Sequence, residues 1–360
     1  MPENVTLLVG TNKGAFFFHS DAARKEWRMT GPHLGGWEVY SLLGDSRHGR
    51  RIYAGTSHFV YGPTIRVSDD LGETWTELET SPRYDKESGF KLERIWQIVP
   101  GHASQPDTLY AGVQEAGLFA SHDRGTTWSE ITSLTAHPTR PSWFPGAGGL
   151  CLHTILVDPT NARRMWVAMS AVGVFRTDDG GQTWTVCTKG LPGVPTGMPD
   201  DGVGRCVHKM VQDPHDPDTL YMQFHGGVFT STDAGDSWTP IENGLPGNFG
   251  FPMCITKSGA LFLIPLDSDE RRYVPEGRIQ VYRSTDRGAS WAPVGSGLPQ
   301  RPEYVGVLRD AMAVDSLDSP GIYFGTTMGQ LFYSPDEGET WNQIPAQLPR
   351  ITTVKTWVTD

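Results

Sequence analysis

Two segments of the chain carry the same pair of chemically active residues. Cys151-Leu152-His153 and Cys206-Val207-His208 each place a thiol two residues before an imidazole. In a β-strand, residues two apart project on the same side, so each Cys and His should point together. Histidine acts as a base near neutral pH or as a metal ligand. The pattern predicts a reactive or metal-binding site where two such strands lie side by side.

Further ionisable residues are expected at the same place, because they occupy equivalent positions of a repeated unit. We predict that strands bring a catalytic set together, consisting of His153, His208, Glu38, Arg94, Arg309 and Asp310. Imidazoles beside thiols suit a transition metal such as Zn, Cu or Fe, with His153, His208, His225 and His58 as candidate ligands. The alternative is structural, with buried histidines bonded to backbone or water and cysteines acting as small hydrophobic residues.

The charged residues of this set also allow two kinds of substrate chemistry. Arg94 and Arg309 would bind an anionic group of a small-molecule ligand. A glycosidase would need two carboxylates across a cleft; the candidates are Glu38, Glu115, Asp310 and the pair Asp200-Asp201. The chain has no His-x-x-x-His, Cys-x-x-Cys or Gly-x-Ser-x-Gly motif that would favour a familiar zinc, redox or serine-hydrolase site.

A short repeated pattern predicts the elements that position these residues. Ser/Thr-x-Asp-x-Gly-x-Ser/Thr-Trp occurs six times between Ser68 and Trp341, and its tryptophans follow one another at intervals of 53, 56, 54, 53 and 50 residues. A fixed period of this length indicates one supersecondary unit that buries its apolar face on the next. Within the pattern, Asp and Ser/Thr bond to the turn backbone, Gly supplies a positive φ and Trp packs between units.

Each unit is predicted to contain four short strands, which is the pattern of a β-propeller blade. Residues 5–30 follow the period without the motif and lack a first strand, whereas residues 351–358 form a strand with no unit after it. We therefore expect an all-β, seven-bladed propeller in one domain, 1–360, with four-stranded antiparallel blades. The C-terminal strand would join the first blade and remove two sheet edges. The expected blades are 5–30 with 351–360, 37–80, 92–133, 150–188, 205–243, 250–296 and 305–346.

The repeated motif resembles the Asp-box, or bacterial neuraminidase repeat, of sialidases, sortilin-type receptors, some xyloglucanases and a photosystem II assembly propeller. Segments such as Gly36–Tyr40 and Tyr304–Met312 resemble single-domain bacterial proteins labelled sialidase-like or glycosyl hydrolase. The resemblance implies the fold more strongly than any activity. Sialidases are typically six-bladed and often carry Arg-Ile-Pro, whereas here Arg94-Ile95 is followed by Trp96.

The lengths of the loops indicate which face of the ring carries the binding site. The long segments 130–150, 187–204 and 265–278 should all lie on the face away from the repeated motifs, and loops gathered on one face of a rigid scaffold mark a binding face. Within them, His137, Trp143 and Phe144 would form a lid. We predict a small-molecule site at this mouth of the channel, of hydrolase or metal-dependent type. The alternative is a non-catalytic scaffold that binds a protein through its loops.

The net charge and composition of the chain limit the kinds of partner that it is expected to bind. The 360 residues carry a net charge of −11, which argues against a nucleic-acid partner, since phosphate binding requires a basic face. No apolar run of about 18 residues suggests a membrane span. Four cysteines do not make a disulfide framework, and the N-terminus lacks the features of a signal peptide. A cytoplasmic location is the resulting expectation.

Overall fold

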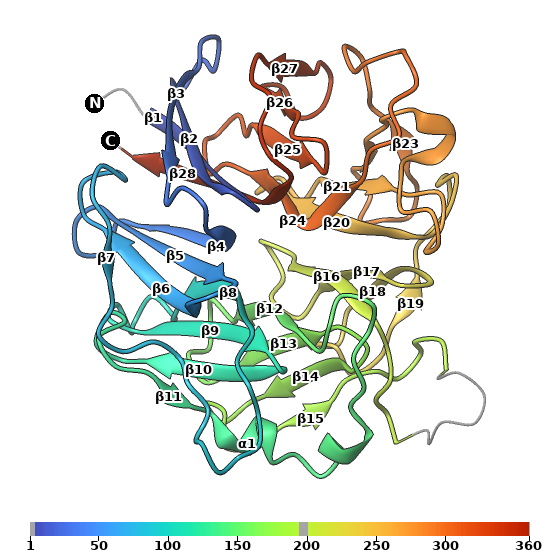
Figure 1. The fold of residues 1–360 in the computed structure, drawn as a ribbon. Helices are drawn as coiled ribbons and strands as arrows, with labels where there is room; N and C mark the ends of the chain where they lie inside the picture. The colour runs from blue at the N-terminus through green and yellow to red at the C-terminus, as the bar shows by residue number, and fades with distance from the viewer. Residues whose placement is uncertain (1–3, 194–200, 360) are drawn as a thin grey trace.

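The protein is an all-β ring of antiparallel sheets (Figure 1), described by a computed structural model over residues 4–193 and 201–359. Five sheets have four strands each. They are β4–β7 (Glu38–Asp45, Arg51–His58, Gly62–Ser68, Thr76–Glu77), β8–β11 (Arg94–Pro100, Leu109–Gln114, Gly117–Ser121, Ser129–Glu130), β12–β15 (Leu152–Val157, Met165–Met169, Gly173–Thr177, Thr185–Val186), β16–β19 (Val207–Gln212, Leu220–Phe224, Gly227–Ser231, Thr239–Pro240) and β20–β23 (Gly250–Ile255, Leu261–Pro265, Tyr282–Ser284, Ala292–Pro293).

The remaining strands form one sheet of eight, in the order β27-β26-β25-β24-β28-β1-β2-β3. Their bounds are β24 Val307–Val314, β25 Ile322–Thr326, β26 Leu331–Ser334, β27 Asn342–Ile344, β28 Ile351–Thr359, β1 Asn4–Thr11, β2 Gly14–Asp21 and β3 Arg28–His33. Helical turns are confined to α1 (Thr132–Thr135) and two short 3-10 segments, Arg140–Ser142 and Pro275–Gly277, within the described residues. None of the described helices has the length and apolar character needed to cross a membrane.

The C-terminal strand joins the two halves of the eight-stranded sheet. β28 runs antiparallel to β1 over its whole length, from Asn4–Thr359 to Thr11–Ile351, and meets β24 in a parallel pair at Asp310–Thr353. The predicted pairing of the two ends of the chain is therefore confirmed. A second link lies nearby, where Arg24 donates two hydrogen bonds of 2.9 Å to the buried carboxylate of Asp315.

The repeated motifs form six turns with the same hydrogen bonds. In the first, the Ser68 hydroxyl donates to Asp70 Oδ1 at 2.8 Å and accepts from the Gly72 amide at 2.8 Å, while the Thr74 amide donates to Asp70 Oδ1. Hydrogen bonds from the hydroxyl and the amide of Thr74 and from the hydroxyl of Ser68 lower the pKa of Asp70 to about 2. The motif glycines have φ between 85° and 93°, a range that disfavours any Cβ.

Four of the motif tryptophans bond to the preceding unit. The indole N–H of Trp238 donates to the Cys187 carbonyl at 2.9 Å, and Trp291 and Trp341 donate in the same way to the Ile241 and Val294 carbonyls. Trp184 donates instead to the Ser133 hydroxyl of α1 at 3.1 Å. Trp75 and Trp128 instead donate to their own motif glycines. Trp75 and Trp128 also pack against buried clusters that include the preceding sheets, so the predicted packing of tryptophan between units is confirmed.

Replacing Trp238 should weaken the ring measurably. Because Trp238 is 2 % exposed, we expect Trp238→Ala to lower the free energy of unfolding by about 3–5 kcal/mol, the usual cost of removing a buried large aromatic. Urea unfolding followed by circular dichroism measures it. Trp75→Ala is the matched comparison and should cost less, because Trp75 is half-buried and donates its indole N–H to its own motif glycine, although its ring packs near Phe17 of the preceding sheet. Equal losses in both variants would contradict the inter-sheet role.

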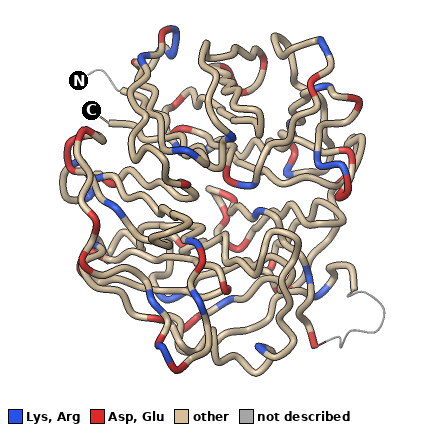
Figure 2. Tube along the Cα trace, in the orientation of Figure 1, with Lys and Arg blue, Asp and Glu red and all other residues tan. Residues whose placement is uncertain are grey.

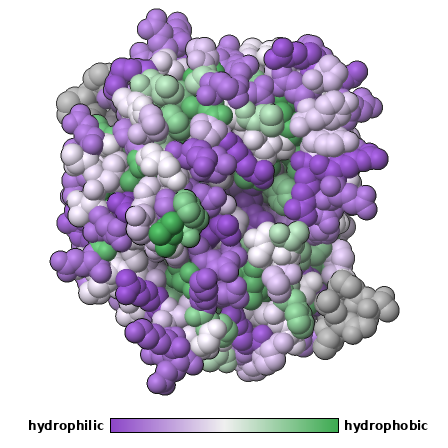
Figure 3. Space-filling model, in the orientation of Figure 1, coloured by the Kyte–Doolittle hydropathy of each residue, from purple (hydrophilic) through white to green (hydrophobic). Residues whose placement is uncertain are grey.

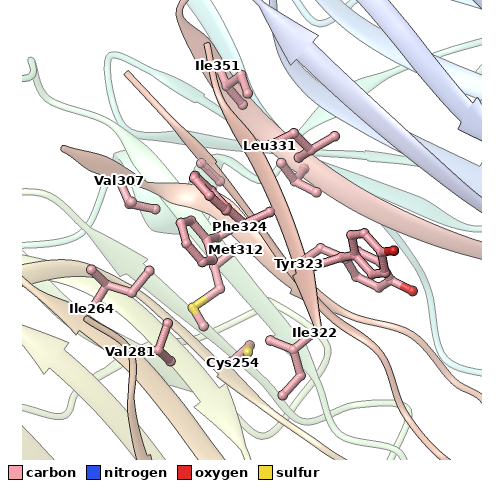
Figure 4. Packing of buried hydrophobic residues seen from close by; sticks show 14 of the residues in the cluster. Cys254, Ile264, Val281, Val307, Met312, Ile322, Tyr323, Phe324, Leu331 and Ile351 are labelled. Atoms are coloured by element: carbon pink, nitrogen blue, oxygen red, sulfur yellow. The ribbon is translucent and has the colours of Figure 1, made fainter. Parts of the chain in front are cut away.

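The apolar core lies between adjacent sheets. Figure 4 shows Cys254 and Ile264 of β20 and β21 packed toward Met312 and Phe324 of β24 and β25, in one continuous buried cluster. Cys254 is 5 % exposed and contributes as a small hydrophobic side chain. Charged residues of both signs are scattered around the ring in Figure 2. Because this core stabilises the sheets, the inner strands and the loops can carry the side chains of a functional site.

Candidate functional site

The first strands β4, β8, β16 and β20 of four sheets, together with β24 of the eight-stranded sheet, line a cavity of about 1070 Å³. Its walls carry Glu38 and Tyr40 of β4, Arg94 and Trp96 of β8, His208 of β16, Phe251 of β20 and Arg309 and Asp310 of β24. We call this space the axial cavity. Figure 3 shows a hollow near the centre of the face in view.

Loops complete the axial cavity at one end. Phe144, Gly193, Asp269 and Arg272 line it and come from the three long segments singled out in the sequence. The turns between second and third strands, including His225, contribute as well. Because the strands are antiparallel, the repeated motifs between third and fourth strands lie at the opposite end.

The predicted lid is only partly at the cavity. Phe144 is 51 % exposed and lines it, but Trp143 is buried, with its ring packed edge-on against Phe175 at 5.3 Å between centroids. His137 also packs edge-on against Phe175, and burial lowers the pKa of His137. Trp143 and His137 therefore anchor the loop on the β12–β15 sheet.

Arg309 of β24 lies on the wall of the axial cavity. Its guanidinium donates to the Ser170 hydroxyl at 2.8 Å and contacts Cys151 Sγ at 3.4 Å. It lies over the rings of Trp96 and Phe251, 5.3 and 6.0 Å from their centroids. Among the described residues, no carboxylate lies within ion-pair distance of Arg309. This arrangement leaves its charge available to an anionic group.

Arg94 and Glu38 lie together at the wall. Arg94 Nε is 3.8 Å from Glu38 Oε2, its Nη1 donates to Gln114, and its guanidinium lies over the Tyr40 ring at 5.3 Å. Burial raises the pKa of Tyr40. The Arg94 charge is thus shared with a carboxylate, unlike that of Arg309.

Asp310 is the buried acid of the site. Its Oδ1 accepts from Lys209 Nζ at 2.6 Å and from Lys355 Nζ at 3.1 Å, so β24, β16 and β28 meet at one ion-pair cluster. Burial alone would raise the pKa of Asp310, but the two ammonium groups outweigh it and hold the pKa well below its ordinary value. Its Oδ2 has no hydrogen-bond partner among the described residues. Asp310 is therefore an ionised acceptor and a poor proton donor.

Cys206, His208 and His225 form a compact cluster on the same wall. One donor atom from each lies within 4.8 Å of the others. His208 Nδ1 donates to the Gly250 carbonyl at 2.6 Å, and burial lowers the His208 pKa to about 3. Burial also raises the pKa of the Cys206 thiol. The cluster combines a neutral imidazole, a thiol and a second imidazole beside the Asp269 carboxylate, 3.6 Å from His225 Nε2.

His153 and His58 do not join this cluster. His153 is fully buried, with Nε2 bonded to the Val207 carbonyl at 2.9 Å and Nδ1 to the Thr154 hydroxyl at 3.0 Å. Both ring nitrogens are occupied, and burial holds its pKa well below the usual value. His58, the last residue of β5, stacks on Phe59 and Tyr61, is tilted against Trp37 and lies away from the described lining of the axial cavity. The geometry thus provides His208 and His225, but neither His153 nor His58, as ligands.

The remaining carboxylate candidates lie apart. Glu115 lines a separate cavity of about 610 Å³ beside Arg140 and Trp143. Asp201 is exposed, and Asp200 falls outside the described residues. The sequence interpretation missed Asp269 and Arg272, which reach the axial cavity from the 265–278 loop and bond to each other at 2.5 Å. Their only sequence signal was the length of that loop.

Comparison with known proteins gives sequence relatives of one kind. No family model matches the chain. A xyloglucanase of a Paenibacillus species is 28% identical over 307 residues, which are 76% of this chain and 27% of that protein. A probable oligoxyloglucan-reducing end-specific xyloglucanase of Neosartorya fischeri is 22% identical over 357 residues, 86% of this chain and 40% of that protein. The chain thus spans less than half the length of these relatives.

Comparison with solved structures identifies the fold. An ancestral GH74 enzyme matches 91% of this chain and 39% of its own with a TM-score of 0.57 at 17% identity. YCF48 from Cyanidioschyzon merolae matches 88% of this chain and 87% of its own with a TM-score of 0.55 at 13% identity. The chain is a β-propeller. Its axial cavity is therefore the central channel of a propeller, open at the loop face.

Proposed function

We propose that this propeller is a hydrolase that binds a small molecule bearing an anionic group in the axial cavity. The observation that carries the proposal is Arg309, whose guanidinium faces the cavity between Trp96 and Phe251 without a carboxylate partner among the described residues. Charge-assisted bonds from a guanidinium in a confined site are strong and directional. The similarity to xyloglucanases supports hydrolysis as the reaction class.

The rest of the axial cavity suits a ligand with both an apolar and a polar part. Trp96, Phe251 and Tyr40 offer aromatic walls beside Arg309. On the polar side, the ionised Asp310 carboxylate lies at the wall with its two lysines, and Glu38 and Asp269 also line the cavity. Such a combination of apolar lining with few fixed polar groups is typical of small-molecule sites.

Binding of phenyl phosphate tests the role of Arg309. This probe pairs an anion with an aromatic ring, and isothermal titration calorimetry measures its Kd. We expect Arg309→Gln to weaken binding by roughly tenfold to a hundredfold, the loss of one charged hydrogen bond. Arg163→Gln, on an exposed turn at the other end of the sheets, should bind like the unmodified protein. Equal binding by the two variants, or no binding by the unmodified protein, would contradict the proposal.

The sequence relatives favour a second candidate, a glycosidase acting on xyloglucan-type oligosaccharides. In the axial cavity, Glu38 and Asp269 would be the two carboxylates, since the lysines keep Asp310 ionised. Glu38 lies beside Arg94, and Asp269 lies beside Arg272. Release of reducing sugar from xyloglucan oligosaccharides would select this candidate.

We further propose that the ring counts seven blades and that the six repeated turns are Asp-boxes. The support is that the eight-stranded sheet consists of two antiparallel groups of four strands, β24–β27 and β28-β1-β2-β3, joined by a single parallel pair. Together with the five four-stranded sheets, these two groups would make the seven blades expected from the sequence. A protein partner at the loop face and a cytoplasmic location stay predictions.

A further inference from the structure

The Cys206, His208 and His225 cluster has the composition of a metal site. Cys206 directly precedes β16, His208 lies on that strand, and His225 opens the turn between β17 and β18 of the same sheet. The imidazole rings of His208 and His225 meet edge to face with centroids 5.4 Å apart. All three side chains line the axial cavity. One sheet therefore supplies the whole cluster, so no movement between sheets is needed to assemble it.

The hydrogen bond of His208 fixes which nitrogen can coordinate. The Gly250 carbonyl can only accept, so Nδ1 must carry the proton and Nε2 holds a lone pair. A ligand histidine in a metal site characteristically donates its other N–H to a carbonyl or carboxylate. The Asp269 carboxylate beside His225 offers that kind of partner to the second imidazole. His208 is thus oriented for coordination before any ion arrives.

We propose that Cys206, His208 and His225 bind one Zn²⁺ ion, with the remaining coordination position facing the axial cavity. A thiolate with two imidazoles suits zinc, and three protein ligands with one open position are the pattern of catalytic zinc sites. The inference deepens the proposed function and rests on it for the role of the open position, where a bound water would meet a ligand held by Arg309.

Zinc binding would change the protonation of the Cys206 thiol. Burial keeps Cys206 a thiol without metal. Zinc forms a bond to Sγ as the S–H bond breaks, and the proton leaves to solvent. Donors bound at about 2.0–2.3 Å lie about 3.3–3.8 Å apart in a tetrahedron, so the cluster must contract by about 1 Å. His225, half-exposed on a turn, is the member free to move.

Titration of the chelator-treated, tag-free protein with ZnCl₂ alone tests the proposal. Calorimetry should show one equivalent bound by the unmodified protein. Replacement by Co²⁺ should give a thiolate-to-cobalt charge-transfer band. We expect His225→Ala and Cys206→Ser each to weaken zinc binding by roughly a hundredfold or more, because each removes one of three ligands. The cobalt band should be missing in Cys206→Ser.

Two matched controls keep the experiment specific. His58→Ala removes an imidazole that stacks outside the axial cavity, and Cys254→Ser alters a thiol in the core; both should bind zinc like the unmodified protein. Circular dichroism verifies folding, and His225→Ala is decisive because its side chain packs least deeply. Less than a tenth of an equivalent of zinc, or unchanged binding by folded His225→Ala, would overturn the site. Retained phenyl phosphate binding would then leave the proposed function standing.

Discussion

Deletion of residues 351–360 abolishes cooperative folding: this is the largest effect that the structure predicts. β28 is the strand between β1 and β24, and Ile351, Val354 and Trp357 are buried along it. Its loss exposes two sheet edges and the apolar surface beneath them, and unpaired edges promote aggregation. We expect the truncated chain to lose near-UV circular dichroism and its unfolding transition.

A shorter truncation provides the control for this deletion. Removing only residues 359–360 keeps the three buried side chains and nearly all of the pairing with β1, so the melting temperature should change little. A 351–360 deletion that still unfolds cooperatively at the unmodified temperature would show that the ring closes without β28.

The second large effect is expected from Asp310→Asn. The substitution leaves Lys209 and Lys355 facing each other without their shared carboxylate, and Lys209 is buried. Removing one partner from a buried ion pair typically costs about 3–5 kcal/mol. Urea unfolding at pH 7 measures the loss. Asp318→Asn, which breaks the exposed pair with Lys257, should change stability little.

The same variant should alter the acid limb of stability. The folded pKa of Asp310 lies below its unfolded value, so its contribution is complete above the ordinary carboxyl pKa of about 4. As pH falls from there toward the folded pKa, the unfolded chain takes up a proton first and stability drops. Asp310→Asn should therefore show a shallower decline below pH 4. The motif aspartates, such as Asp70, would still contribute to the decline. An unchanged slope would contradict the ion-pair account.

The fold could be predicted because its signals are local and repeated. Each motif contains the Ser or Thr, Asp, Gly and Trp that close one turn, and each turn makes the same hydrogen bonds. Closure was predictable from a missing first strand and a spare last one. The Arg24–Asp315 ion pair had no such signal, because 291 residues separate its partners.

The site was harder to predict because strand position does not fix hydrogen bonding. His153 and His208 occupy equivalent positions, and each bonds to a carbonyl of the next sheet. The difference lies in the following residue. The Thr154 hydroxyl bonds to the second nitrogen of His153, whereas Lys209 bonds to Asp310, and within the described part of the chain His208 bonds through Nδ1 alone. Cys206 was paired with His208 in the sequence, but only the structure adds it to the ligand set.

The axial cavity is proposed as the functional site, with Arg309 as its anion-binding group. A crystal structure of the protein soaked with phenyl phosphate is the strongest test of this assignment. We expect electron density for the phosphate within hydrogen-bond distance of the Arg309 guanidinium, with the phenyl ring against Trp96 or Phe251. An empty axial cavity, or a ligand bound only elsewhere on the ring, would contradict it.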